Sequence, residues 1–138
     1  DHRDLHSFPT RRSSDLANWL HAVVQISKTR STNVKKIINE TFASHRSLKM
    51  VTVVDDDIDP TDAVAVEFAM ATRFQADKDL VIIKNVRGSS LDPSSDQRKL
   101  RTAKMGIDAT IPGSKRPDGF KLGKIPKAKT NLKDYLKK

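Results

Sequence analysis

The hydrophobic positions of the chain fall into short runs separated by polar segments. Three of these runs are rich in β-branched residues and are too short for helices, so each predicts a strand. They cover residues 19–27, 49–54 and 79–84. The later two contain the continuous apolar stretches VTVV and LVII, which are typical of strands that are covered on both faces.

The two intervening segments carry apolar residues at helical spacing, which predicts helices. The first helix follows the N-cap candidates Ser31 and Thr32 and ends near Ser44. The second covers about residues 62–73, with Thr61 as its cap. This alternation of strands and helices predicts an α/β fold, with a parallel or mixed sheet and flanking helices.

After residue 85 the pattern becomes irregular. Residues 85–97 are rich in Gly, Ser, Asp and Pro and predict a loop, and residues 106–114 predict a turn-rich break. We therefore expect an α/β domain over residues 17–112, followed by a basic C-terminal extension over residues 113–138.

The first sixteen residues, DHRDLHSFPTRRSSDL, have neither a helical nor a strand period. They resemble the translation of a common short-read sequencing adapter, and all sixteen match. We therefore expect residues 1–16 to be a disordered, non-native segment that plays no part in folding. The same resemblance implies that the natural chain is longer, so that residues 17–138 are a C-terminal domain fragment of a larger protein.

Composition and charge narrow the function classes. The chain has no cysteine, which excludes disulfides and thiolate metal sites. Its apolar runs are far shorter than the roughly 20 residues that span a bilayer, and it lacks a signal-peptide pattern, so a cytoplasmic protein is the default. The net charge of +9 is concentrated in residues 98–138, which carry thirteen Lys or Arg against three Asp. A basic nucleic-acid-binding module is therefore one alternative function.

The candidate functional residues follow the ends of the predicted strands. The run DDDID at residues 55–59 closes the second predicted strand, and carboxylates there can hold a hard cation or face a crevice ligand. A nucleotide-sugar transferase of the DxD type is therefore a second alternative function. The structural interpretation of the DDDID run is that its Asp side chains cap turns and the next helix. Lys28 and Arg30 follow the first predicted strand and precede a helix start, which is a plausible phosphate site.

Four stretches, VTVVDDDID, VEFAMATRFQADKDLVII, VRGSSLDPSS and KMGIDAT, together resemble the C-terminal part of the UbiD family in their order and spacing. The resemblance covers about residues 18–110 and is most similar to archaeal members. It implies a carboxy-lyase that reversibly decarboxylates an aromatic or α,β-unsaturated acid with prenylated flavin mononucleotide (prenylated FMN). Anhydromevalonate phosphate and polyprenyl-hydroxybenzoate are the candidate substrates that the resemblance suggests.

The resemblance also implies cofactors and partners. Prenylated FMN, Mn²⁺ and K⁺ would be bound mainly by a region upstream of this chain, which also holds the family's catalytic Glu-Arg-Glu set. The chain by itself is therefore expected to be inactive and to contribute neither catalytic residues nor metal ligands. A flavin prenyltransferase would supply the cofactor, and the enzyme would form a homo-oligomer.

Within this chain the resemblance points to four residues. Lys28 matches a basic position close to the cofactor. Arg87, Ser89 and Leu91 belong to a loop that lines the substrate pocket, with Ser89 and Leu91 at positions that face it. Ser89 replaces a bulkier group of the cinnamate-type members, which argues against a cinnamate-like substrate. The DDDID run is a family signature, to which we assign a structural role in loop and interdomain packing.

Overall fold

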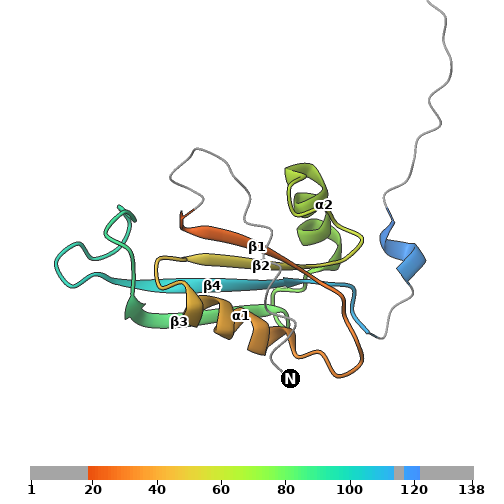
Figure 1. Cartoon of the computed structure of the whole chain (residues 1–138), viewed down its shortest axis with the longest axis horizontal. Helices are drawn as coiled ribbons and strands as arrows, with labels where there is room; N and C mark the ends of the chain where they lie inside the picture. The colour runs from red at the N-terminus through yellow and green to blue at the C-terminus, as the bar shows by residue number, and fades with distance from the viewer. Residues whose placement is uncertain (1–18, 114–116, 122–138) are drawn as a thin grey trace, which may run out of the picture.

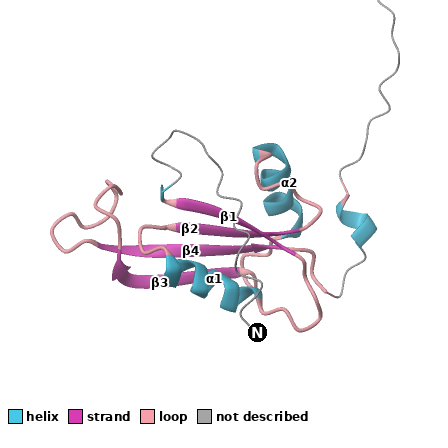
Figure 2. Cartoon of the chain, viewed as in Figure 1, coloured by secondary structure: helices cyan, strands magenta, loops and turns pink. Residues whose placement is uncertain are grey.

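The computed structural model describes residues 19–113 and 117–121, and within them one sheet and two α-helices are found (Figure 2). The strands are β1 (His21–Ile26), β2 (Met50–Asp55), β3 (Leu80–Arg87) and β4 (Arg101–Ala109). The helices are α1 (Val34–Ser44) and α2 (Ala63–Arg73), and a 3₁₀ helix covers Pro117–Phe120. In the part of the chain that the structure describes, no helix is long and apolar enough to cross a membrane.

The sheet is mixed, with the strand order β1-β2-β4-β3 (Figure 1). β1, β2 and β4 run parallel to one another, and β3 pairs antiparallel with β4 at the edge. Helices α1 and α2 pack into two separate core clusters on either side of the sheet. This arrangement confirms the predicted α/β class, with a mixed sheet and flanking helices.

Strand β2 explains why the sheet is covered on both faces. Val51 and Val53 pack in one core cluster with Ile38 of α1, whereas Val54 packs in the other cluster with Ala69 of α2. Successive side chains of a strand point to opposite faces. The run of β2 is therefore buried on both sides, as its sequence predicts, and each face needs its own helix. The same prediction is wrong for the LVII run of β3, because β3 is an edge strand and its Ile82 is 55% exposed.

Strand β4 corrects the sequence-based prediction. The pattern predicts a break at residues 106–114, but β4 continues to Ala109 and lies between β2 and β3. Lys104 and Gly106 interrupt the apolar alternation there, although both are buried. A Cβ atom added at Gly106 would lie 2.2 Å from Cγ2 of Ile38. The glycine therefore marks the close approach of α1 to the sheet and not a turn.

The helix caps also differ from the prediction by one or two residues. α1 is capped by Asn33 and not by residues 31–32, and the Asn33 side chain accepts a hydrogen bond from the Lys36 N–H at 3.1 Å. α2 is capped by Asp62 and not by Thr61. In both cases a side-chain oxygen satisfies N–H groups in the first turn, which have no partner within the helix.

Candidate functional site

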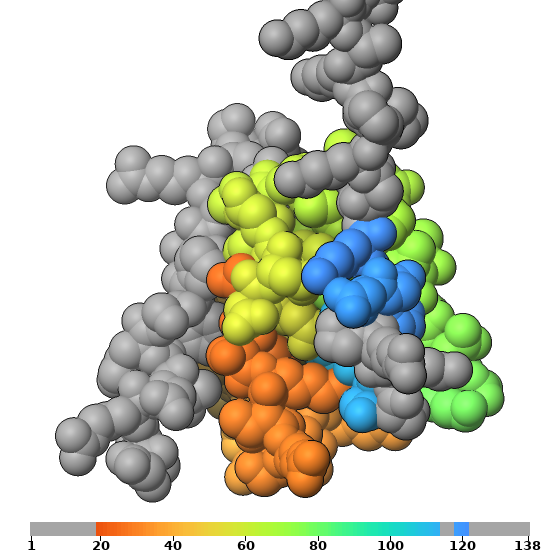
Figure 3. All heavy atoms as spheres, turned by 90° about the vertical axis from the view of Figure 1, so that its right-hand side faces the viewer, coloured from red at the N-terminus to blue at the C-terminus, as the bar shows by residue number. Residues whose placement is uncertain are grey.

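The carboxyl ends of the three parallel strands meet at one edge of the sheet, where Lys28 connects two of them. In Figure 3 the segment after β1 (orange) lies beside the segment after β2 (yellow) at this edge. The Lys28 ammonium donates to Oγ1 of Thr110 at 2.8 Å and to the carbonyl oxygen of Ile111 at 2.9 Å. Because an ammonium group has three N–H donors, one remains for a further acceptor. Lys28 is half-buried, so a ligand can reach it.

A buried ion cluster lies beside Lys28. Arg73, only 2% exposed, donates from Nη1 to Asp57 Oδ1 at 2.8 Å and from Nη2 to Asp57 Oδ2 at 2.7 Å. Its Nη1 also donates to Oδ2 of Asp55 at 3.2 Å, and the same oxygen accepts the Ile111 N–H at 2.6 Å. The cluster of Asp55, Asp57 and Arg73 therefore ties the end of α2 to the segments that follow β2 and β4.

The environment of the cluster shifts the pKa of each member. Burial raises the pKa of Asp55, against the opposing effects of the Ile111 N–H and the Arg73 charge. Hydrogen bonds from Arg73 lower the pKa of Asp57, and those to Asp57 raise the pKa of Arg73. Both carboxylates are thus committed to the guanidinium group.

These contacts of Asp55 and Asp57 with Arg73 argue against the DxD-type transferase. A DxD site needs its carboxylates free to hold a divalent ion, but Asp57 uses both oxygens on Arg73. Across residues 19–113 and 117–121, no group of three or more His, Asp or Glu side chains could hold a metal ion. The geometry supports the structural interpretation of the DDDID run.

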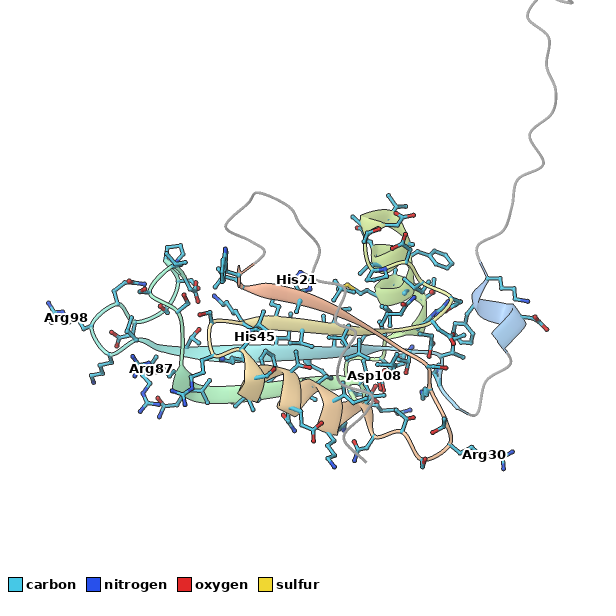
Figure 4. All side chains as sticks on the ribbon, viewed as in Figure 1. His21, Arg30, His45, Arg87, Arg98 and Asp108 are labelled. Carbon is cyan, nitrogen blue, oxygen red and sulfur yellow. The ribbon has the colours of Figure 1, made fainter. Side chains whose placement is uncertain are left out.

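The predicted substrate-loop residues lie at the other end of the sheet. Since β3 runs opposite to its neighbours, its end at Arg87, and the loop that carries Ser89 and Leu91, are remote from Lys28. Figure 4 shows this separation, with Arg87 at one end and Arg30, which follows Lys28 closely, at the other. β4, with nine residues, runs between the two ends and spans about 30 Å. The structure therefore does not bring Lys28 together with the loop.

Asp92 holds the substrate loop in place. It is 3% exposed and accepts hydrogen bonds from Lys49 Nζ at 3.0 and 2.8 Å, and from the N–H and Oγ of Ser94 at 3.0 and 2.8 Å. Within the same loop, the Leu91 N–H donates to Oγ of Ser89 at 3.2 Å. Ser89 is half-buried and Leu91 is 52% exposed. The loop is therefore internally braced and presents the Leu91 side chain to its surroundings.

Replacement of Asp92 by asparagine is expected to lower the free energy of unfolding by about 1–3 kcal/mol at pH 7, because a charged acceptor is lost. The Lys49 and Ser94 hydrogen bonds lower the pKa of Asp92 in the folded protein. Its stabilisation is therefore present above the unfolded pKa of about 3.9 and is lost as the pH falls through the lower folded value.

Urea unfolding of the parent chain and of Asp92→Asn at pH 7 and at pH 3 tests this expectation. The difference between them should shrink at the lower pH. Asp77→Asn, at an exposed position, is the matched control and should be close to neutral at both. A difference that stays constant between the two pH values would show that the Asp92 charge contributes nothing.

Comparison with known proteins decides the family. The family model for the 3-octaprenyl-4-hydroxybenzoate carboxy-lyase C-terminal domain matches residues 15–109, more than half of the chain. The chain belongs to the UbiD family. The resemblance found in the sequence is thereby confirmed.

Relatives within the UbiD family include the anhydromevalonate phosphate decarboxylase of Methanocaldococcus jannaschii, 56% identical over 108 residues, or 78% of this chain and 26% of the relative. A solved structure of the UbiD-class enzyme HmfF from Pelotomaculum thermopropionicum with FMN matches with a TM-score of 0.69 at 43% identity, over 85% of this chain and 26% of the other. An evolved dimeric form of HmfF with prenylated FMN matches with a TM-score of 0.58 at 37% identity, over 85% and 23%. The chain spans about a quarter of the length of the curated relatives it matches.

The sequence analysis did not predict two features of this UbiD-family domain, namely the buried Arg73 and the contact between Lys28 and Thr110. Arg73 shares the buried face of α2 with Val66 and Ala69, and a cation on an apolar face requires an anionic partner nearby. That signal could have paired Arg73 with the acidic run. The contact from Lys28 to Thr110 crosses 82 residues and depends on β4, so no local pattern predicts it.

Proposed function

We propose that this chain is the C-terminal domain of a UbiD-family decarboxylase that acts on anhydromevalonate phosphate with prenylated FMN as cofactor. The observation that carries the proposal is the 56% identity to a relative named for that activity, over 78% of this chain. Because the chain spans about a quarter of such relatives, we assign the activity to the longer protein and expect the chain alone to be inactive. Mn²⁺, K⁺ and the catalytic residues belong, in this proposal, to the part upstream.

The residues around Lys28 fit the phosphate group of a flavin nucleotide. Lys28 keeps one N–H after its bonds to Thr110 and Ile111, and those two bonds fix the direction of its side chain. The segment that follows, residues 29–33, carries hydroxyl, amide and guanidinium donors and no carboxylate. When bound, the cofactor would supply an electron sink for decarboxylation. The role proposed for Lys28 is to hold the cofactor.

Arg87, Ser89 and Leu91 are proposed to line the substrate pocket. Their distance from Lys28 within this domain means that the rest of the enzyme must complete both sites. A homo-oligomer could bring the two sites together, because a second protomer can place its substrate loop beside Lys28 of the first protomer. The loop braced by Asp92 would then present Leu91 as an apolar contact for the carbon skeleton of the substrate.

Expression of the full-length gene with and without a flavin prenyltransferase tests the function. With the prenyltransferase we expect the absorption of the prenylated cofactor and release of CO2 from anhydromevalonate phosphate. The second candidate substrate is a polyprenyl-hydroxybenzoate, for which the matching family model is named. Absence of CO2 release from anhydromevalonate phosphate by cofactor-loaded enzyme would overturn the substrate, and release from neither acid would overturn the proposed activity.

A substitution tests the role of Lys28. In the full-length enzyme, Lys28→Met is expected to weaken cofactor retention by about tenfold, which corresponds to loss of roughly one charged hydrogen bond. Lys35→Met removes an exposed lysine from α1 and serves as the matched control. Flavin content after dialysis is the measurement. Equal flavin content in the two variants would remove Lys28 from the cofactor site.

A further inference from the structure

A hollow of about 290 Å³ lies on the α1 face of the sheet, at the end opposite Lys28. Its volume is close to the lower end of the roughly 300–1,000 Å³ that small-molecule sites occupy. Among the described residues, the lining combines apolar side chains with three cations and includes no acidic residue. Its members include Phe42, Ile83 and Val86 together with Arg46, Arg87 and Lys104.

Lys104 is a buried cation for which the described residues offer no anionic partner. It lies on β4, is 5% exposed, and donates from Nζ to the carbonyl oxygen of Arg46 at 2.7 Å. Nζ also lies 5.4 Å from the centre of the Phe42 ring. Among the residues that the structure describes, no carboxylate pairs with Lys104, and burial lowers its pKa. Burying an ammonium without a counter-ion is costly, so an anion in the hollow would stabilise it.

The two arginines at the hollow are also free to bind. Arg46 and Arg87 are exposed, and no hydrogen bond or ion pair of either guanidinium is found among the described residues. A second hollow, of about 230 Å³, adjoins at Arg87 and is lined by Arg98 and Arg101 as well. Figure 4 shows Arg87 and Arg98 at this same end of the molecule. The local field is therefore positive, which favours an anionic ligand.

We propose that the hollow between α1, β3 and β4 binds a phosphate monoester with a small apolar body. Lys104 and the guanidinium groups of Arg46 and Arg87 would contact the phosphate oxygens. Phe42, Ile83 and Val86 would contact the apolar body. Guanidinium groups are suited to this role because their planar fork matches phosphate geometry. This proposal deepens the proposed function and rests on it, because Arg87 is also proposed to line the substrate pocket and the proposed substrate is itself a phosphate monoester. The probes below do not need to be decarboxylated, so failure of the hollow to bind them is distinguishable from failure of the proposed activity.

The alternative is that Lys104 only donates to the carbonyl oxygen of Arg46, just beyond the end of α1, with no ligand. The two cases differ in what the hollow recognises. A lysine in that role predicts no preference among added anions beyond the general attraction of a basic chain. A binding site predicts that charge and apolar body act together, so that a ligand with both binds more tightly than a ligand with either one.

Phenyl phosphate, inorganic phosphate and phenol are the probes, and calorimetric titration into the 138-residue chain and into the full-length enzyme is the measurement. Phenyl phosphate is expected to bind at least about tenfold more tightly than either of the other two. Lys104→Met should weaken its binding by about tenfold or more. Lys84→Met is the matched control, because Lys84 is an exposed β3 residue one position after Ile83, so it points to the opposite face of the sheet.

Three outcomes would overturn the proposal. They are equal affinities for phenyl phosphate and inorganic phosphate, equal losses in Lys104→Met and Lys84→Met, and binding to the 138-residue chain that disappears in the full-length enzyme. The last would show that the rest of the enzyme covers the hollow. Circular dichroism checks that each variant is folded. If Lys104→Met does not fold, Arg87→Gln replaces it, since no described side chain depends on that guanidinium, and its expected loss is about threefold or more.

Discussion

Replacement of Arg73 by leucine is expected to lower the free energy of unfolding by about 3–5 kcal/mol, the usual cost of removing one partner from a buried ion pair. The substitution leaves Asp55, which is 8% exposed, without its cation. It also removes the two hydrogen bonds that hold Asp57 in the segment after β2. Since a domain of this size has a total stability of about 5–15 kcal/mol, the loss is a large fraction of the whole.

Urea unfolding followed by circular dichroism measures this effect. Arg30→Leu is the matched control, because Arg30 is exposed and should cost less than about 0.5 kcal/mol. Adding Asp55→Asn to Arg73→Leu should recover part of the loss, since the uncompensated charge is then removed. A double variant no more stable than Arg73→Leu alone would contradict the electrostatic explanation.

Replacement of Gly106 by alanine should lower the free energy of unfolding by about 3 kcal/mol, the upper end of the usual range for overpacking. The new Cβ would meet Cγ2 of Ile38 at 2.2 Å and Cδ1 at 3.2 Å. Ile38 is fully buried, so its side chain has no free space to move into. The strain can be relieved only by shifting α1 away from the sheet.

A double-mutant cycle with Ile38→Ala separates this steric effect from any other effect of the added methyl group. Ile38→Ala alone should cost about 2–5 kcal/mol because it leaves a cavity. Combined with Gly106→Ala it should cost less than the sum of the two, since the methyl group then fills part of that cavity. Gly113→Ala is the control, because no atom of the described residues lies within 4 Å of its added Cβ. Additive losses would contradict the steric explanation.

The same glycine shows why the sequence predicts one part of the fold and not another. Strands β1 and β2 and helix α1 follow from local patterns, because each carries its own apolar period. Strand β4 does not, since Gly106 is required by the bulk of Ile38, which lies far away along the chain. Lys104 has a similar effect, because a lysine in a strand pattern indicates an exposed position, and this one is buried over Phe42.

The cofactor-binding role of Lys28 stays a prediction, and local patterns account for only part of the geometry around it. Lys28, at the carboxyl end of a parallel strand, lies where crevice ligands bind in α/β sheets, so its position alone suggested a phosphate contact. Its fixed orientation depends on Thr110, which only the missed strand brings close. The separation of Lys28 from Arg87 could not be predicted from local sequence patterns either, because it follows from the antiparallel direction of β3.

We propose that this chain is the C-terminal domain of a longer UbiD-family enzyme, because it spans about a quarter of its curated relatives. The sequence of the intact genomic locus tests this proposal most directly. We predict that the reading frame continues upstream of Ala17 into a flavin-binding region and that residues 1–16 are absent from the locus. A start codon at or close to Ala17, with no longer reading frame ahead of it, would contradict this proposal.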